Sequence, residues 1–116
     1  MSVRPDAVSR VVSSAASTNA TSAKAAPAQL YSAVGYNTAA AVLYLKFYDK
    51  ASAPTVGTDT PKMTLPLPPA SGFSFSFPTP FEFKKGLAYA LTALAADADT
   101  TALVAADVVG LNVIYT

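Results

Sequence analysis

Carboxylates are the side chains of this sequence most able to do chemistry. Asp97 and Asp99 stand two residues apart in a predicted loop, a spacing that suits part of a calcium site. The third ligand, the glycine and the distal glutamate of a calcium loop are missing, so we interpret both as solvated or capping residues. Glu82 could pair with Asp49 or Asp59 as catalytic carboxylates, but nothing in their spacing supports such a pair.

Histidine and cysteine are both absent from the chain. Disulfides, thiolate metal sites and cysteine nucleophiles are therefore excluded, and a hydrolase would lack its most common general base. We expect a protein that is not an enzyme and that holds no metal and no cofactor.

The composition favours contact with other proteins. Of the 116 residues, 52% are hydrophobic and only 13% are charged, and the formal net charge is +1. So small a charge provides no field to hold nucleic acid or an anionic membrane. Charged residues interrupt every apolar run before membrane-spanning length, and no apolar signal core follows the first residues, so we expect a soluble chain that is not exported. A surface rich in Ala, Ser, Thr, Pro and Tyr suits burial between subunits.

Tyrosines form the second group of candidate contact residues. Outward-facing tyrosines could line a sugar-binding surface, as in many β-sandwich receptor binders. Alternatively they fill core edges and subunit contacts, where a ring with one polar end is favoured, and we prefer this interpretation. The protein-contact candidates among them are Tyr31, Tyr36, Tyr44, Tyr48 and Tyr115.

Residues 1–28 are predicted to form an extended N-terminal arm. The segment is rich in Ala, Ser, Thr and Asn and cannot bury enough apolar surface to order itself. It is either a loose terminus or an arm that becomes ordered on a neighbouring subunit. For the second case a short strand-like anchor supplies the contact candidates Val8, Arg10, Val11 and Val12.

Residues 29–116 are predicted to form an all-β domain organised around one strand. In residues 43–48, Leu43, Leu45 and Phe47 alternate with Tyr44, Lys46 and Tyr48, which is typical of a half-buried central strand. Residues 29–36 precede it as a strand, and the turn at Asn37 and Thr38 predicts that the two strands pair antiparallel.

Later strands follow the same period of two. Pro66 cannot donate to a ladder, which predicts an edge position for residues 62–67. Phe73, Phe75 and Phe77 share one face that we expect to be core, and Lys84-Lys85-Gly86 is a predicted turn. With residues 87–93 and 108–115, and surface loops at 51–61 and 94–107, this gives about seven or eight strands, the pattern of an antiparallel β-sandwich that is jelly-roll-like.

The chain contains two distinctive sequence motifs. Tyr-Leu-Lys-Phe-Tyr-Asp-Lys-Ala at residues 44–51 and Pro-Thr-Val-Gly-Thr-Asp-Thr-Pro at residues 54–61 stand close together. With Gly35-Tyr36-Asn37 and residues 86–90, they resemble a family of small virion-associated proteins of tailed bacteriophages, over approximately residues 29–115.

The resemblance implies a virion structural protein. By analogy with other phages, we expect a capsid decoration (cement) protein that binds the major capsid protein on the capsid surface and is assembled in the host cytoplasm. Such proteins commonly oligomerise, often as trimers. The alternative is a tail, neck or fibre-associated module, or a receptor-binding domain that recognises host glycans.

Overall fold

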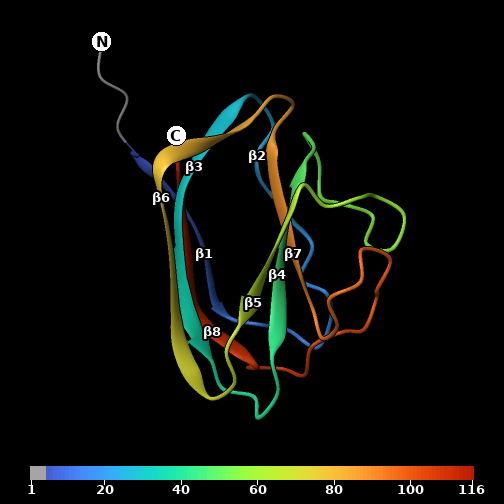
Figure 1. Cartoon of the computed structure of the whole chain (residues 1–116). Coiled ribbons are helices and arrows are strands. Elements are labelled where there is room, and N and C mark those ends of the chain that lie inside the picture. The colour runs from blue at the N-terminus through green and yellow to red at the C-terminus, as the bar shows by residue number, and fades with distance from the viewer. Residues whose placement is uncertain (1–4) are drawn as a thin grey trace.

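The fold is an antiparallel β-sandwich of two four-stranded sheets, seen edge-on in Figure 1. The computed structural model describes residues 5–116. Its strands are β1 (Ala7–Ser13), β2 (Thr21–Lys24), β3 (Ala28–Asn37), β4 (Leu43–Asp49), β5 (Met63–Leu67), β6 (Ser71–Phe83), β7 (Leu87–Thr92) and β8 (Val108–Tyr115). No helix in residues 5–116 is long and apolar enough to cross a membrane.

Strands from opposite ends of the chain pair with each other in both sheets. Sheet A runs β1-β8-β3-β6 and sheet B runs β2-β7-β4-β5. The first strand pairs with the eighth, the second with the seventh, the third with the sixth and the fourth with the fifth, all antiparallel. The all-β sandwich predicted from the alternation of side chains is therefore confirmed.

The core lies between the two sheets. Leu45 and Phe47 of β4 are fully buried there, as their alternation predicts, and they face Leu30 of β3 and Leu111 of β8 in one apolar cluster. Pro66 lies in β5 at the edge of sheet B, which confirms the predicted edge position.

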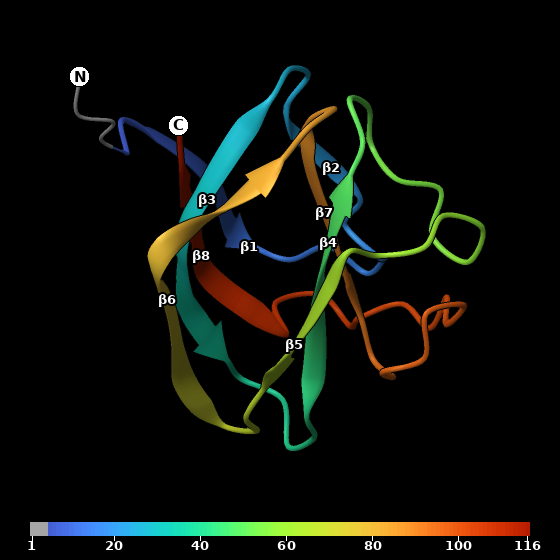
Figure 2. The same ribbon diagram turned by 45° about the horizontal axis from the view of Figure 1, so that its top comes forward.

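Strands β3 and β4 lie in different sheets, so their predicted antiparallel pairing is wrong. The reason is the buried side chain of Asn37, which ends β3. Its amide nitrogen donates to the carbonyl oxygens of Ala41 and Leu67, and its carbonyl oxygen accepts from the backbone nitrogen of Ala39. These bonds turn the chain across the core instead of back along β3 (Figure 2).

The predicted N-terminal arm contains two strands of the sandwich. β1 pairs with β8 and β2 pairs with β7, so both lie within the domain that the sequence predicts to begin at residue 29. Ser9 Oγ lies 2.7 Å from the hydroxyl of the buried Tyr89, and Tyr115 donates from its hydroxyl to the carbonyl oxygen of Ala23 at 3.0 Å. These contacts order the segment on its own chain. Residues 1–4 of the predicted arm lie outside the described residues.

Candidate interaction surfaces

The outer face of sheet B is closed by two long loops. Lys46, Tyr48, Ala88 and Ala90 point away from the core, yet each is at most 1% exposed. Lys46 Nζ donates to the carbonyl oxygen of Ala96 at 2.6 Å, and Val56 packs against Tyr48. The loops at 50–62 and 93–107 therefore form part of the folded unit and leave little of this face for a partner.

Burial shifts the pKa values of the two large polar side chains beneath these loops. It lowers the pKa of Lys46, and the negative charges of Asp99 and Asp97 oppose that shift. Burial also raises the pKa of the Tyr48 hydroxyl, and the negative charges of Asp59 and Asp97 raise it further. The Tyr48 hydroxyl has no hydrogen-bond partner among residues 5–116. Neither group is placed to meet a ligand from solvent.

The outer face of sheet A is open. Paired residues share a face of a sheet, and the ladder aligns Val8, Ile114, Ser32 and Ser76 in one row. The next row contains Arg10, Asn112, Val34 and Ser74. Val12, which is 67% exposed, and Tyr36, which is 44% exposed, lie beyond these rows. We call these ten residues the sheet A face; Arg10 is the only charged residue among them.

The predicted contact residues of β1 divide between two faces. Val8, Arg10 and Val12 are exposed on the sheet A face, whereas Val11 points inward and packs against the core. The alternation of the strand separates them, so Val11 does not share the surface of its neighbours.

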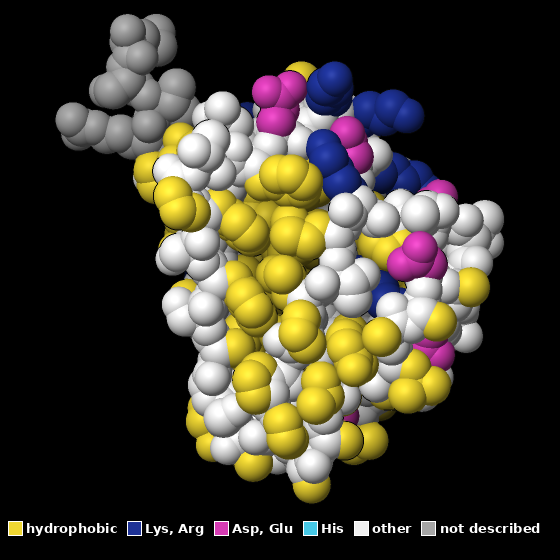
Figure 3. All heavy atoms as spheres, viewed as in Figure 1, with side chains coloured by type: hydrophobic (Ala, Val, Ile, Leu, Met, Phe, Trp, Pro, Cys, Tyr) yellow, Lys and Arg dark blue, Asp and Glu magenta, His cyan; other side chains and the backbone are white. Residues whose placement is uncertain are grey.

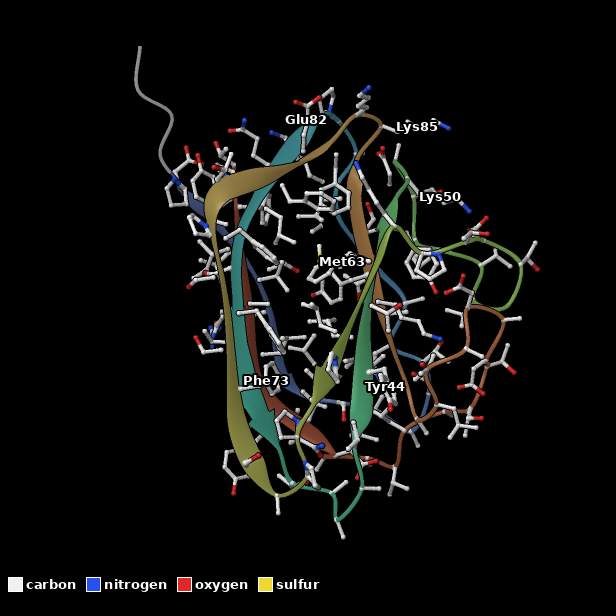
Figure 4. The ribbon with its side chains drawn as sticks, viewed as in Figure 1. Tyr44, Lys50, Met63, Phe73, Glu82 and Lys85 are labelled. Carbon is white, nitrogen blue, oxygen red and sulfur yellow. The ribbon has the colours of Figure 1, made fainter. Side chains whose placement is uncertain are left out.

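The five candidate tyrosines do not form one surface. Tyr36 alone is exposed, and its hydroxyl donates to the carbonyl oxygen of Ala70 at 3.2 Å. Tyr31 and Tyr44 are half-buried, Tyr44 on β4 of the opposite sheet (Figure 4). Tyr115 points toward β2, as its bond to Ala23 requires. Tyr48, predicted to contact a partner, is instead inside the chain's own fold.

An apolar seam runs between the edge strands β5 and β6. Phe81 is 37% exposed, and Phe75, Phe77, Met63 and Leu65 are half-buried beside it. Figure 3 shows these strands flanking a continuous band of hydrophobic side chains, and Figure 4 places Met63 and Phe73 in the space between the sheets. The face of Phe73, Phe75 and Phe77 is therefore core at Phe73 and only partly covered at the other two.

Lys62 closes one end of this seam. Its Nζ lies 4.9 Å from the ring centroid of Phe81 and 5.0 Å from that of Phe83, and it donates to the carbonyl oxygen of Glu82. The ammonium group therefore links the start of β5 to the end of β6. Beside it, at the same end of the sandwich, lies a cavity of about 310 Å³. Its lining includes both a positively charged side chain, Lys24, and a negatively charged one, Glu82.

The carboxylates considered for chemistry hold turns and loops. Asp99 accepts from the backbone nitrogens of Leu94 and Thr101, so it holds the 93–107 loop and does not cap a helix. Asp59 accepts from Lys50 Nζ at 2.6 Å. Asp49 accepts from three backbone nitrogens of the turn between β6 and β7. In residues 5–116 no three acidic side chains gather as metal ligands would.

The chain matches no protein-family model, no curated protein and no solved structure. Its functional interpretation therefore rests on the residues and on the surfaces that they form.

Proposed function

We propose that this chain is a virion structural protein of a tailed bacteriophage, and that it decorates the assembled capsid. The sequence motifs of residues 44–51 and 54–61 suggest the class, through their resemblance to virion-associated proteins. The observation that carries the role is the difference between the two sheets: loops cover the outer face of sheet B, while the sheet A face is open and nearly free of charge.

Such a face suits contact with another protein. Exposed Val8, Val12 and Tyr36 present apolar area, and the serines around them can be desolvated at lower cost than charges. Arg10, the one charged residue of the sheet A face, lies on the edge strand β1, where a charge can stay at the rim of the contact. A chain that binds only the assembled shell stabilises it by mass action, because each bound copy shifts the equilibrium away from dissociation.

The use of the polar groups favours a structural role over catalysis. Asp49, Asp59 and Asp99 each accept hydrogen bonds that hold a loop or turn. A glycan-binding role is less favoured, because the tyrosines expected to line such a site lie on different faces and one is buried.

Copy number in purified particles tests the proposal. We expect quantitative mass spectrometry to give a ratio to the major capsid protein near one, or near another simple fraction set by the symmetry of the shell. A ratio of a few per cent would contradict capsid decoration and favour a neck, tail or fibre position.

Binding to shells that lack the chain tests the surface itself. Ser74→Glu with Asn112→Glu adds two charges to the sheet A face without entering the core, so we expect binding to be lost. Ser52→Glu with Thr60→Glu adds the same charge to the exposed loop at 50–62 and should leave binding unchanged. Equal binding by both double variants would overturn the assignment of this face.

A further inference from the structure

The sandwich has four edge strands, and three of them carry features that discourage pairing with another chain. β5 contains Pro66, and β6 contains Pro78 and Pro80. β2 is only four residues long, and its register shifts between Ser22 and Lys24. Prolines, short strands and irregular register are the usual means by which proteins protect sheet edges.

β1 carries none of these features. It spans seven residues without a proline, and from Ala7 to Val11 it pairs with β8 in unbroken register. Only one side of β1 is paired, so half of its backbone N–H and C=O groups face away from the sheet. A long, regular and unprotected edge is suited to the addition of another strand.

We propose that β1 of one chain pairs antiparallel with β1 of a second copy, joining two A sheets into one continuous eight-stranded sheet. The charges around β1 argue for a second copy as the occupant. Asp6 precedes the strand by one residue, and Arg10 lies four residues later. In a two-fold arrangement centred on Val8, Asp6 of each copy stands opposite Arg10 of the other.

Other registers match less well. A pairing centred on Arg10 would place two like charges directly opposite each other, which destabilises a sheet. A pairing centred on Ser9 would place Arg10 opposite Val8 and leave the charges unmatched. The register centred on Val8 forms two ion pairs and brings together two Val8 side chains, each 51% exposed in the single chain.

The pairing also bears on shell binding. A two-fold axis perpendicular to the sheet keeps both sheet A faces on the same side, so one dimer presents two of them at once. The soluble unit would then be a dimer, in contrast to the trimer expected from the phage resemblance, because an edge strand that pairs with its own copy closes after two chains.

Charge exchange tests the register. Analytical ultracentrifugation of the full chain, whose mass is 11.9 kDa, should give the molecular mass of a dimer. Arg10→Asp and Asp6→Arg should each weaken the dimer, by roughly tenfold in Kd for two lost pairs. The double variant Asp6→Arg with Arg10→Asp should recover most of the affinity. Lys85→Asp, an equal charge reversal on the turn between β6 and β7, should have no effect.

Cross-linking tests the axis independently, because the chain contains no cysteine of its own. Directly opposite residues in an antiparallel pair have Cα atoms about 4.5 to 5.5 Å apart, within reach of a disulfide. Val8→Cys should therefore form covalent dimers on mild oxidation. Val12→Cys, on the same face but four residues from the axis, should not.

A chain that stays monomeric, sediments as a trimer or cross-links equally at both positions would overturn the inference, as would a double charge variant that recovers no affinity. These outcomes are separate from those of the proposed function. A dimer that is absent from particles refutes capsid decoration alone, and a monomer bound at high copy number refutes the β1 pairing alone.

Discussion

The carboxylate of Asp49, at the end of β4, accepts a hydrogen bond from the backbone nitrogen of Lys85 at 2.8 Å. The same carboxylate accepts from the backbone nitrogens of Lys84 and Gly86, at 3.2 and 3.4 Å. A single side chain thus satisfies the turn that carries the chain from sheet A back to sheet B.

Replacing Asp49 with asparagine should destabilise the fold. The amide retains one acceptor oxygen but loses the charge, so the free energy of unfolding should fall by about 1 to 3 kcal/mol. Urea denaturation of the two proteins at pH 7 measures the difference. Asp97→Asn, in an exposed part of the 93–107 loop, is the matched control and should change stability by less than about 0.5 kcal/mol.

The same interaction predicts how stability depends on pH. Burial opposes the charge of Asp49, but the backbone nitrogens of Lys85, Lys84 and Gly86 and the charge of Lys62 outweigh it, so the pKa lies below its usual 3.8. A lowered pKa stabilises the fold above the unfolded-state value, and this stabilisation is lost as pH falls through the folded-state value. Below pH 4, Asp49→Asn should therefore lose stability less steeply than the natural chain. Parallel curves in urea titrations at each pH would contradict this.

Gly86→Ala should be strongly destabilising. A Cβ atom at Gly86 would lie 2.6 Å from the carbonyl oxygen of Lys24 and 2.7 Å from that of Lys50. Both obstacles are backbone, so the turn itself must shift, and we expect a loss of about 2 kcal/mol or more. Gly72→Ala is the control, because there the nearest atoms are 3.7 Å away and the contact is ordinary. Thermal melts that rank the two variants equally would argue against this packing.

Two tyrosines should respond oppositely to loss of the hydroxyl. Tyr89 shares a hydrogen bond with Ser9, so Tyr89→Phe should lower the free energy of unfolding by about 1 kcal/mol. The Tyr48 hydroxyl is buried without a partner among residues 5–116, so Tyr48→Phe should be neutral or stabilising by up to about 1 kcal/mol. Denaturation of the two single variants compares them directly, and equal losses would show that Tyr48 has a partner.

Deletion of residues 1–26 should prevent cooperative folding. It removes both β1 and β2, and with them the pairing to β8 and β7, and it leaves Tyr89 without the hydroxyl of Ser9. We expect the truncated chain to be insoluble or to lack a cooperative melt. A truncated protein with a normal melting transition would instead support the arm predicted from the sequence.

The sequence predicts the strands better than their partners. Alternation in β4 identifies Leu45 and Phe47 as core, because period-two patterning is local information. It also places Lys46 and Tyr48 on the opposite face, correctly. It could not predict that they are buried, because the covering residues Ala96 and Val56 belong to loops without periodicity of their own.

The sheet A face could be predicted in part, because the alternation of side chains along β1 is also local information. Alternation separates Val8, Arg10 and Val12 from Val11 once β1 is known to be a strand. Residues 8–12 are predicted as a strand-like anchor on a neighbouring subunit, but the weak apolar content of residues 1–28 conceals that this strand pairs with β8 of its own chain, about a hundred residues later. In β3, a register shift between Leu30 and Ser32 breaks the simple alternation of side chains. No residue type at these positions predicts the shift.

The pairing of β1 with β8 also sets the order in which the fold can be completed. The first strand has no sheet neighbour until residues 109–115 have been synthesised, so sheet A cannot close before the last strand of the sandwich has been made. Contacts between such distant segments require a large loop to close before they stabilise anything, which makes folding slow. We therefore expect the unprotected edge of β1 to be exposed for longest in the newly made chain, when pairing with the wrong partner is easiest.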